Sequence, residues 1–438
     1  MSTDASFAAS LAVASPFNSP SSVTRSRPPK TAEIWCRVID NFGDAGVTWR
    51  LARRLRDLGL AVRLVVDRPD VLAKLVPELD SDQAESVVRG IAVARWDDRA
   101  ACAAEVLKEL ESRSGDASKE EGKLSAPEGA FARSASDLTI EAFGCRLPEA
   151  VEALLARSRE ARVARGLPAD GSGFLYMNLD YLSAEDWVEA CHDVWGLHPN
   201  LPLRKLWYFP GFTARTGGLL IEEDLREETE NFASRRDDLL RALGAKPERP
   251  ALFLFAYPVN ALARLADGIA AAAETEPLTV LAAPGAAGDE IERLLQGRAG
   301  VDVCRTPFVP QEAFDDLLRA SDAVVIRGED SFVRAQLAGK SLLWATYPTE
   351  DNAHLIKMDA WLARVVPVLA ETDPESARIL ETANREWLSG ELEPETFAAW
   401  WRSRGAIERG MARWRDRLFA HGDLARRIVE RAERVEGS

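Results

Sequence analysis

The sequence is poor in the residue types that hold metal ions or form disulfides. Four histidines occur among 438 residues, and none has HExxH or similar ligand spacing. The five cysteines lie far apart, form no CxxC pair and are odd in number. Such cysteines are typical of reduced thiols and argue against both a disulfide framework and a zinc site.

Long apolar runs and targeting signals are missing as well. No window approaches the roughly 18–20 apolar residues that a membrane helix needs. Residues 1–20 include a short apolar stretch, but no basic region precedes it, as it would in a signal peptide. We therefore expect a soluble, cytoplasmic protein without a membrane partner.

The chain also lacks an excess of positive charge. Its 55 Lys and Arg residues against 70 Asp and Glu give a net charge of −15, and its pI is near 5.0. Because phosphate binding needs a basic face, this balance argues against nucleic acid as the main partner, although a local basic patch would not show in the total.

What is present is enough material for two α/β domains. Short apolar runs alternate with helical patterns, which is typical of parallel sheets covered by helices. The expected strands form two series, 33–39, 61–66, 91–96, 137–143 and 173–180, then 251–257, 278–284, 301–308, 323–329 and 341–347. The polar stretch 222–238 separates the two series. We predict two Rossmann-like domains that face each other across a cleft, followed by a helical C-terminal tail.

Composition suggests where these units begin and end. Residues 1–30 are rich in Ser, Pro, Ala and Thr, as disordered segments often are. The predicted units are a disordered extension at 1–30, a first domain at 31–225 with a low-complexity insertion at 112–136, a second domain at 226–405 and a helical tail at 406–438. Open α/β sheets bind ligands outside the carboxyl ends of their strands, so the turns after the strands are the places to look.

The first such turn, "DNFGDAG", carries two carboxylates, Asp40 and Asp44. It contains glycines but not G-x-G-x-x-G, so we do not expect it to bind a dinucleotide. One interpretation is that Asp44 caps a helix whose apolar spacing starts at Val47, while Asp40 bonds to its own turn. The other is general-base chemistry or recognition of a cationic group.

A second constellation lies where the strand "AVVI" runs into "RGEDSF". A helix is expected to begin there, with Asp330 or Ser331 as its N-cap. Free amides at a helix start bind anions, and Arg327 adds positive charge beside them, which would suit a nucleotide diphosphate. A capped helix with a surface ion pair is the alternative.

Aromatic residues near these turns have two interpretations. Phe308 and Phe314 flank Gln311 and could sandwich a flat base while the amide reads its edge. Phe255 and Tyr257 end the strand 251–257 and should point to one face, because side chains alternate along a strand. Core packing is the alternative for all four aromatics.

Charged clusters elsewhere carry less information. The segments "RLARR" and "RLFAHGDLARRIVERAERVEGS" have charges at helical spacing and predict solvated helix faces. Two aromatic–Gly stretches, "NLDYLSAEDW" and "WYFPGFTARTGGL", predict either a cleft wall or tight packed loops. No Walker A or G-x-S-x-G motif is present.

Longer stretches carry a resemblance to a known family. They are "WCRVIDNFGDAGVTWRLARRL", "FVPQEAFDDLLRASDAVVIRGEDSFVRAQLAGK", "IEAFGCRLPE", "YLSAEDW", "PGFTARTGGL" and "YPTEDNAHLIK". Through them the chain resembles the EarP family, the arginine rhamnosyltransferases of bacterial translation elongation factor P. The resemblance runs from about residue 33 into the tail and leaves out the N-terminal extension and the 112–136 insertion.

The resemblance implies a GT-B fold and an inverting mechanism that uses no metal or other cofactor. It implies dTDP-β-L-rhamnose as donor and an arginine of elongation factor P as acceptor, which activates that factor for rescue of stalled ribosomes. Asp44 would then be the general base, Asp40 a supporting carboxylate and Glu329 a third catalytic group. The implied donor-binding residues are Phe42, Gly43, Phe255, Tyr257, Phe308, Gln311, Phe314, Arg327, Gly328, Asp330, Ser331 and Tyr347. One departure is Ala256 before Tyr257, where relatives are expected to have glycine.

The chemistry of the residues agrees with this reading. A guanidinium stays protonated in water and is a poor nucleophile, but carboxylates can hold it and accept a proton. Inversion requires the nucleophile opposite the leaving group, so the base should belong to one domain and the diphosphate site to the other. The sequence shows this division, with Asp40 and Asp44 in the first half and "RGEDSF" in the second. Two alternatives stay open: a sugar-nucleotide transferase or epimerase acting on another acceptor, and a non-catalytic partner of elongation factor P.

Overall fold

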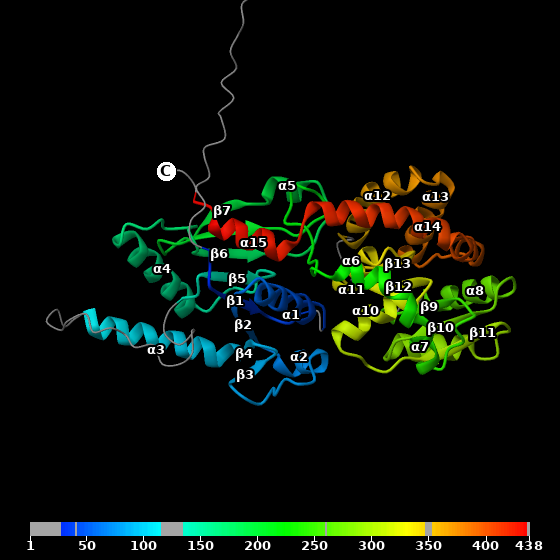
Figure 1. The fold of residues 1–438 in the computed structure, drawn as a ribbon, viewed down its shortest axis with the longest axis horizontal. Coiled ribbons are helices and arrows are strands. Elements are labelled where there is room, and N and C mark those ends of the chain that lie inside the picture. Colours follow the sequence, from blue (N-terminus) through cyan, green and yellow to red (C-terminus); the bar gives the residue numbers. More distant parts are fainter. Residues whose placement is uncertain (1–27, 40–41, 115–134, 259–260, 347–352, 436–438) are drawn as a thin grey trace, which may run out of the picture.

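The structure is a computed structural model that describes residues 28–39, 42–114, 135–258, 261–346 and 353–435. These residues form two α/β domains side by side, each with its own sheet, as Figure 1 shows. Most of the expected extension at 1–30 and of the insertion at 112–136 lies outside the described residues.

The first domain contains an eight-stranded sheet in the order β3-β4-β2-β1-β5-β6-β8-β7. Its strands are β1 Thr31–Cys36, β2 Ala61–Val66, β3 Glu85–Val88, β4 Ile91–Arg95, β5 Leu138–Ala142, β6 Leu175–Leu179, β7 Val194–Leu197 and β8 Arg204–Tyr208. The edge strands β3 and β7 pair antiparallel with β4 and β8, and the other pairs are parallel. Strands β1, β5 and β6 are almost wholly buried, because helices cover both faces of a parallel sheet, and Glu33 and Glu141 are buried within them.

The helices of this domain follow the strands in alternation. They are α1 Phe42–Asp57, α2 Pro69–Leu75, α3 Trp96–Ser114, α4 Glu149–Ala164 and α5 Trp187–Cys191. The prediction missed β3, β7 and β8. The edge strands β3 and β7 are four residues each and largely exposed, so they lack the apolar signal of the central strands.

The second domain contains a five-stranded parallel sheet in the order β11-β10-β9-β12-β13. Its strands are β9 Ala251–Leu254, β10 Leu278–Ala282, β11 Val301–Arg305, β12 Ala323–Arg327 and β13 Leu342–Ala345. All five were predicted, but each ends before its predicted carboxyl end. The residues beyond these ends form the loops that line the site.

Helices surround this second sheet and continue to the C-terminus. They are α6 Leu225–Asn231, α7 Ala233–Ala242, α8 Leu262–Ala273, α9 Ala286–Leu295, α10 Gln311–Ala320, α11 Asp330–Leu337, α12 Ala353–Ala370, α13 Pro374–Ser389, α14 Pro394–His421 and α15 Leu424–Glu433. The boundary expected at residue 405 falls inside α14. The Trp-rich tail is core material, since Trp400 and Trp401 are fully buried. Within the described ranges, no helix is long and apolar enough to cross a membrane.

Both sheets have the strand order of a doubly wound fold. The first strand of each domain, β1 or β9, lies in the middle, and the chain then builds outward in one direction before reversing. The reversal occurs between β1 and β5 in one domain and between β9 and β12 in the other. Ligands bind at such switch points, outside the carboxyl ends of the strands.

The C-terminal chain crosses back from the second domain to the first. Helix α14 packs on α8, and α15 then lies on the first domain against α1, in red in Figure 1. Asp423, between them, accepts a hydrogen bond from Arg54 Nε of α1 at 3.0 Å and one from the Ile221 amide at 3.1 Å. Gly218 (φ 77°) meets Gly422 there so closely that a Cβ would lie 2.6 Å from the Gly422 carbonyl oxygen. Two chain crossings therefore join the domains at one tightly packed point.

Candidate active site

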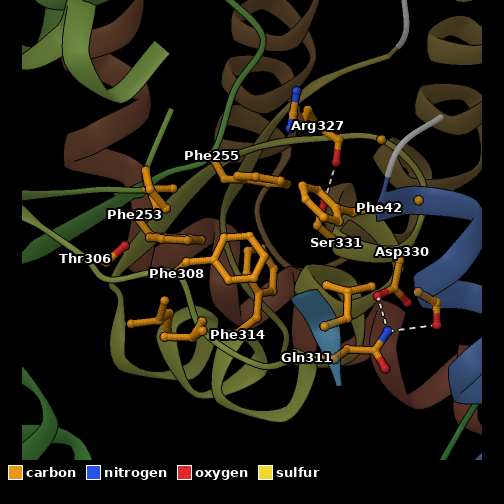
Figure 2. A pocket seen from close by; sticks show the side chains of 18 of the residues that line it. Phe42, Phe253, Phe255, Thr306, Phe308, Gln311, Phe314, Arg327, Asp330 and Ser331 are labelled. Carbon is orange, nitrogen blue, oxygen red and sulfur yellow. Dashed lines mark hydrogen bonds between the residues drawn. The ribbon is translucent and has the colours of Figure 1, made fainter. Parts of the chain in front are cut away.

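A cleft of about 970 Å³, measured out to its open mouth, lies between the domains. The start of α1 forms one wall, and the loops after β9, β11 and β12 form the other, as the close view in Figure 2 shows. The lining includes these residues that the sequence marked for donor binding: Phe42, Gly43, Phe255, Tyr257, Phe308, Gln311, Phe314, Arg327, Gly328, Asp330 and Ser331. Glu329 lines it as well. The fold thus brings residues nearly 300 positions apart into one cavity.

Aromatic rings form the second domain's side of this cleft. Phe314 meets Phe253 edge-on at 5.4 Å and Phe255 at 5.2 Å, both with interplanar angles of 73°. Phe308 is 49% exposed and is therefore not core, unlike Phe253, which is fully buried. Across the domain boundary, Phe42 of α1 lies 5.4 Å from Phe308. These rings form an aromatic cup. Phe253, which also lines it, was not predicted from the sequence.

Gln311, the first residue of α10, has its side-chain amide fixed in one orientation. Its Nε2 donates to the Gly46 carbonyl at 2.8 Å and to Asp330 Oδ2 at 3.1 Å, the dashed lines in Figure 2. Both partners are acceptors only, so the NH₂ end must face them. The Oε1 atom is buried and has no hydrogen-bond partner among the described residues. A ligand that brings an N–H group to this atom would satisfy it.

Arg327, the last residue of β12, stacks on two aromatic rings. Its guanidinium carbon lies 4.5 Å from the Phe255 ring centroid and 4.7 Å from that of Tyr257. Since β9 ends at Leu254, strand alternation does not orient these aromatics as predicted; they lie in the following loop, and the Arg327 contact brings them together. The arrangement holds a positive charge at the mouth of the aromatic cup.

The turn from β12 into α11 differs in detail from its prediction. The helix begins at Asp330 with Glu329 as N-cap, so neither Asp330 nor Ser331 caps it. Ser331 Oγ instead donates to the Arg327 carbonyl, and Gly328 takes a positive φ of 71° that favours glycine. The turn therefore fixes the backbone, while Glu329 remains directed into the domain interface.

Asp44 lies inside the first turn of α1, because the helix begins at Phe42 rather than at Val47. Its Oδ2 accepts a hydrogen bond from the Ile39 amide at 2.8 Å, so it braces the preceding loop instead of capping its own helix. The residue is 2% exposed. Gly46, two residues on, lies so close to the second domain that a Cβ would sit 3.1 Å from Gln311 Nε2.

Tyr181, in the loop after β6, holds Asp44 from within the first domain. Its hydroxyl donates to Asp44, and its ring stacks on Phe143 at 4.5 Å. Burial raises the pKa of the Tyr181 phenol well above its ordinary value, and the nearby charges of Asp44 and Glu329 add to the rise. Tyr181 was not singled out from the sequence, although it lies in the "YLSAEDW" stretch.

Glu329 faces Asp44 from the other domain. Its Oε2 accepts the Leu182 amide at 3.2 Å, and its Oε1 lies 3.4 Å from Lys357 Nζ. Burial raises the pKa of Glu329, Lys357 pulls it down, and the charge of Asp44 adds to the rise. Two carboxylates from different domains therefore interact electrostatically at the domain interface, although only Glu329 lines the cleft and Asp44 is buried beside it.

Two predicted site residues, Asp40 and Tyr347, lie outside the described residues. Residues that the sequence analysis did not connect with the site include Gly46, Phe253, Tyr181 and Lys357, which the structure places on or beside it. In the described ranges, no group of three or more His, Cys, Asp or Glu side chains is placed to hold a metal ion.

Comparison with known proteins agrees over almost the whole chain. A family model described as Elongation-Factor P (EF-P) rhamnosyltransferase EarP matches residues 32–111 and 122–433. A protein-arginine rhamnosyltransferase of Pseudomonas putida is 35% identical over 419 residues, which cover 91% of this chain and 97% of the relative. Its counterpart in Neisseria meningitidis serogroup B is 35% identical over 351 residues, covering 76% of this chain and 78% of the relative.

A solved structure described as the structural basis for EarP-mediated arginine glycosylation of translation elongation factor EF-P has a similar fold. The TM-score is 0.53 at 24% identity, and the match covers 90% of this chain and 96% of that chain. The predicted GT-B architecture, with two Rossmann-like domains and a helical C-terminal region, is confirmed.

Proposed function

The chain belongs to the EarP family of elongation factor P rhamnosyltransferases and is a glycosyltransferase, and we propose that it transfers L-rhamnose from dTDP-β-L-rhamnose to an arginine side chain of elongation factor P. The proposed reaction inverts the anomeric centre, needs no metal ion and takes place in the cytoplasm. The modified factor would then act in the rescue of stalled ribosomes.

The observation that carries this proposal is that two carboxylates from different domains, Asp44 and Glu329, both act on the Tyr181 phenol and raise its pKa. Bringing two like charges together in a partly buried interface is unfavourable, as the raised pKa of Glu329, due first to burial and further to the charge of Asp44, indicates. A guanidinium between them would relieve the repulsion and form charge-assisted hydrogen bonds to both. The site therefore suits a cationic acceptor.

The opposite side of the cleft suits a pyrimidine nucleotide. The aromatic cup of Phe255, Phe308 and Phe314 offers flat apolar surfaces on which a base can stack. The unpartnered Oε1 of Gln311 can accept the imide N–H of thymine, which neither adenine nor cytosine carries at that ring position. These features support a pyrimidine with an imide N–H, which the thymine of the proposed dTDP-linked donor has in common with uracil.

In the proposed step, the acceptor guanidinium gives one proton to Asp44, and the freed nitrogen lone pair attacks C1 of rhamnose. The C1–N bond forms as the bond from C1 to the diphosphate oxygen breaks, and dTDP leaves with that electron pair. The product is a rhamnosylated guanidinium, which keeps its positive charge. Glu329 holds the guanidinium during transfer, and we assign Asp40 a supporting role.

We assign stabilisation of the departing dTDP to the second domain. Arg327 supplies positive charge at the cup, and the first amides of α11 lie at the same turn, which the Ser331 hydroxyl braces by donating to the Arg327 carbonyl. Asp330 would repel the diphosphate, but Arg50 holds its carboxylate bidentately and offsets its charge. Tyr257 and Tyr347 are proposed to reach the donor, the latter at its diphosphate.

Intact-mass analysis of elongation factor P tests the proposal. Incubation with this protein and dTDP-β-L-rhamnose should add one deoxyhexose to one arginine, located by peptide fragmentation. A matched reaction with UDP-glucose controls for donor choice. An unmodified factor, or sugar released without attachment to protein, would contradict the proposal and favour another acceptor.

A further inference from the structure

Helix α1 makes several contacts with the second domain from one face. Gly46, Arg50 and Arg53 are spaced by four and three residues, so they share that face. The Gly46 carbonyl accepts from Gln311, and Arg53 pairs with Glu312 of α10 at 2.6 Å. The first turn of the same helix carries Asp44. A rigid helix thus connects the proposed base to the wall of the donor pocket.

Arg50 has the most contacts of this face. Its Nε and Nη2 donate to Asp330 Oδ1 and Oδ2 at 3.1 and 3.2 Å, a bidentate pair. Its Nη1 donates to Glu222 at 2.9 Å and to Asp315 at 3.1 Å. The side chain is only 3% exposed. Glu222 lies in the segment before α6, Asp315 on α10 and Asp330 on α11. One guanidinium therefore joins α1 to three separate segments.

Arg334 completes the cluster from α11. It pairs with Glu222 at 2.7 Å and with Asp315 at 2.8 Å. Three carboxylates therefore share two arginines. Burial lowers the pKa of Arg50, but Asp315, Asp330 and Glu222 outweigh this and raise it. Without Arg50, one buried carboxylate, that of Asp315, and two half-buried ones would share one arginine, which is unfavourable in an interface.

We infer that Arg50 is a positioning residue: it locks α1 to the second domain in the closed state and so holds Asp44 at its working distance from the donor. The inference rests on the proposed function for its kinetic consequence. Arg50 does not line the donor cleft. It borders a smaller cavity beside Glu329, but its guanidinium is bound there by three carboxylates rather than by a reactant. It acts through Asp330, which does line the cleft, and through the helix that carries Asp44.

The competing explanation is that Arg50 only stabilises the fold. Arg99 of α3 provides the matched control, because it is equally buried and also bidentate. It binds Glu33 of β1 at 2.6 and 3.3 Å, within the first domain and away from the donor cleft. Replacing either arginine removes a buried ion pair, but only the Arg50 pair spans the two domains.

The test compares Arg50→Met with Arg99→Met in the full-length protein, below the melting temperature of both. We expect Arg50→Met to lower kcat by at least about tenfold, because loss of a buried charge partner depopulates the closed state. Small-angle scattering of the same variant without ligands should show a larger radius of gyration. Arg99→Met should keep kcat within about threefold of wild type, since it changes only the folded fraction, and should keep the wild-type radius.

Asp315→Asn is the second variant, because Asp315 belongs to the ion-pair cluster around Arg50 but does not line the donor cleft. It should lower kcat and open the molecule in the same way. Equal kcat losses in Arg50→Met and Arg99→Met, or a wild-type radius and kcat in Arg50→Met, would overturn the inference. If the wild-type protein transfers no rhamnose, the proposed function fails, while the scattering comparison still decides whether Arg50 closes the domains.

Discussion

The two sides of the cleft share a topology but differ in chemistry. On the first domain, the switch point holds the buried Asp44, bonded to the hydroxyl of Tyr181, beside the helix start at Phe42 that lines the cleft. On the second domain, the corresponding loops present a cup of phenylalanines and Arg327. Under the proposed function, the same doubly wound frame would take a cation on one side and a flat base with an anionic tail on the other.

This difference shows how little the strand order decides about the ligand. Both sheets have a point where the chain reverses, between β1 and β5 or between β9 and β12, so both supply a binding edge. Which ligand binds depends on a few loop residues beyond the strand ends. The comparison predicts that substitutions on the first side will change the chemical step, whereas those on the second will change nucleotide affinity.

The largest expected effect is that of Asp44→Asn. Removing a general base should lower the transfer rate by about 10² to 10⁴-fold, while dTDP affinity stays near the wild-type value because the aromatic cup is unchanged. Single-turnover kinetics and nucleotide titration measure the two quantities. Asp67→Asn is the matched control, since Asp67 also accepts an amide of the loop before α1, that of Val38 at 2.9 Å. A normal rate in Asp44→Asn would remove this residue from the mechanism.

Glu329→Gln should follow, with a loss on the order of tenfold to a hundredfold in transfer, since one charge-assisted contact to the guanidinium is lost. Glutamine keeps the shape of the side chain and can still accept the Leu182 amide. The measurement is the Michaelis constant for elongation factor P together with kcat. If donor affinity changed instead and the acceptor parameters did not, Glu329 would act on the nucleotide rather than on the acceptor.

Phe308→Ala should act on the nucleotide alone. Loss of one stacking surface should weaken dTDP binding by roughly 1–3 kcal/mol, as measured by calorimetry, with little change in kcat at saturating donor. Trp187→Ala is a control of equal exposure, because both side chains are 49% exposed and Trp187 lies outside the cleft. An unchanged dissociation constant would show that Phe308 does not contribute to nucleotide binding.

The smallest expected effect is a shift in pH dependence. Transfer needs ionised Glu329, whose pKa is raised, first by burial, so activity should fall as the pH drops through a value above the ordinary range of a glutamate. Lys357 lowers this pKa. Lys357→Met should therefore move the acid limb of the kcat profile to higher pH. Lys340→Met, which removes a similar pair with Glu408 at 3.5 Å outside the cleft, should leave the limb in place; a shift to lower pH in Lys357→Met would contradict the assignment.

The sequence predicted the frame and most of the cleft, but not the ends of its elements. The central strands were recognisable because buried parallel strands are continuous apolar runs. Their ends were not, because Phe255 is as apolar as Leu254 although the strand stops between them. For the same reason, the start of α1 at Phe42 was hidden in a segment that reads as a turn.

The ion-pair cluster around Arg50 could not be predicted from the sequence either. The segment "RLARR" was predicted to form a solvated helix face, and this was wrong for Arg50 and Arg54, which are 2% and 4% exposed. Helical spacing shows that charges share a face, but it cannot distinguish a face in water from one that meets carboxylates of another domain. The partners, Asp315 and Asp330, lie 265 or more positions away.

The proposal that the first domain supplies the base and the second holds the donor is tested most directly by the anomeric configuration of the product. If Asp44 delivers the guanidinium from the side opposite the diphosphate, rhamnose from a β-linked donor must become α-linked to arginine. NMR spectroscopy of the glycosylated arginine, through the one-bond C1–H1 coupling and the nuclear Overhauser contacts of H1, reports this configuration. The account predicts α-L-rhamnosyl-arginine, and a β-linked product would contradict it.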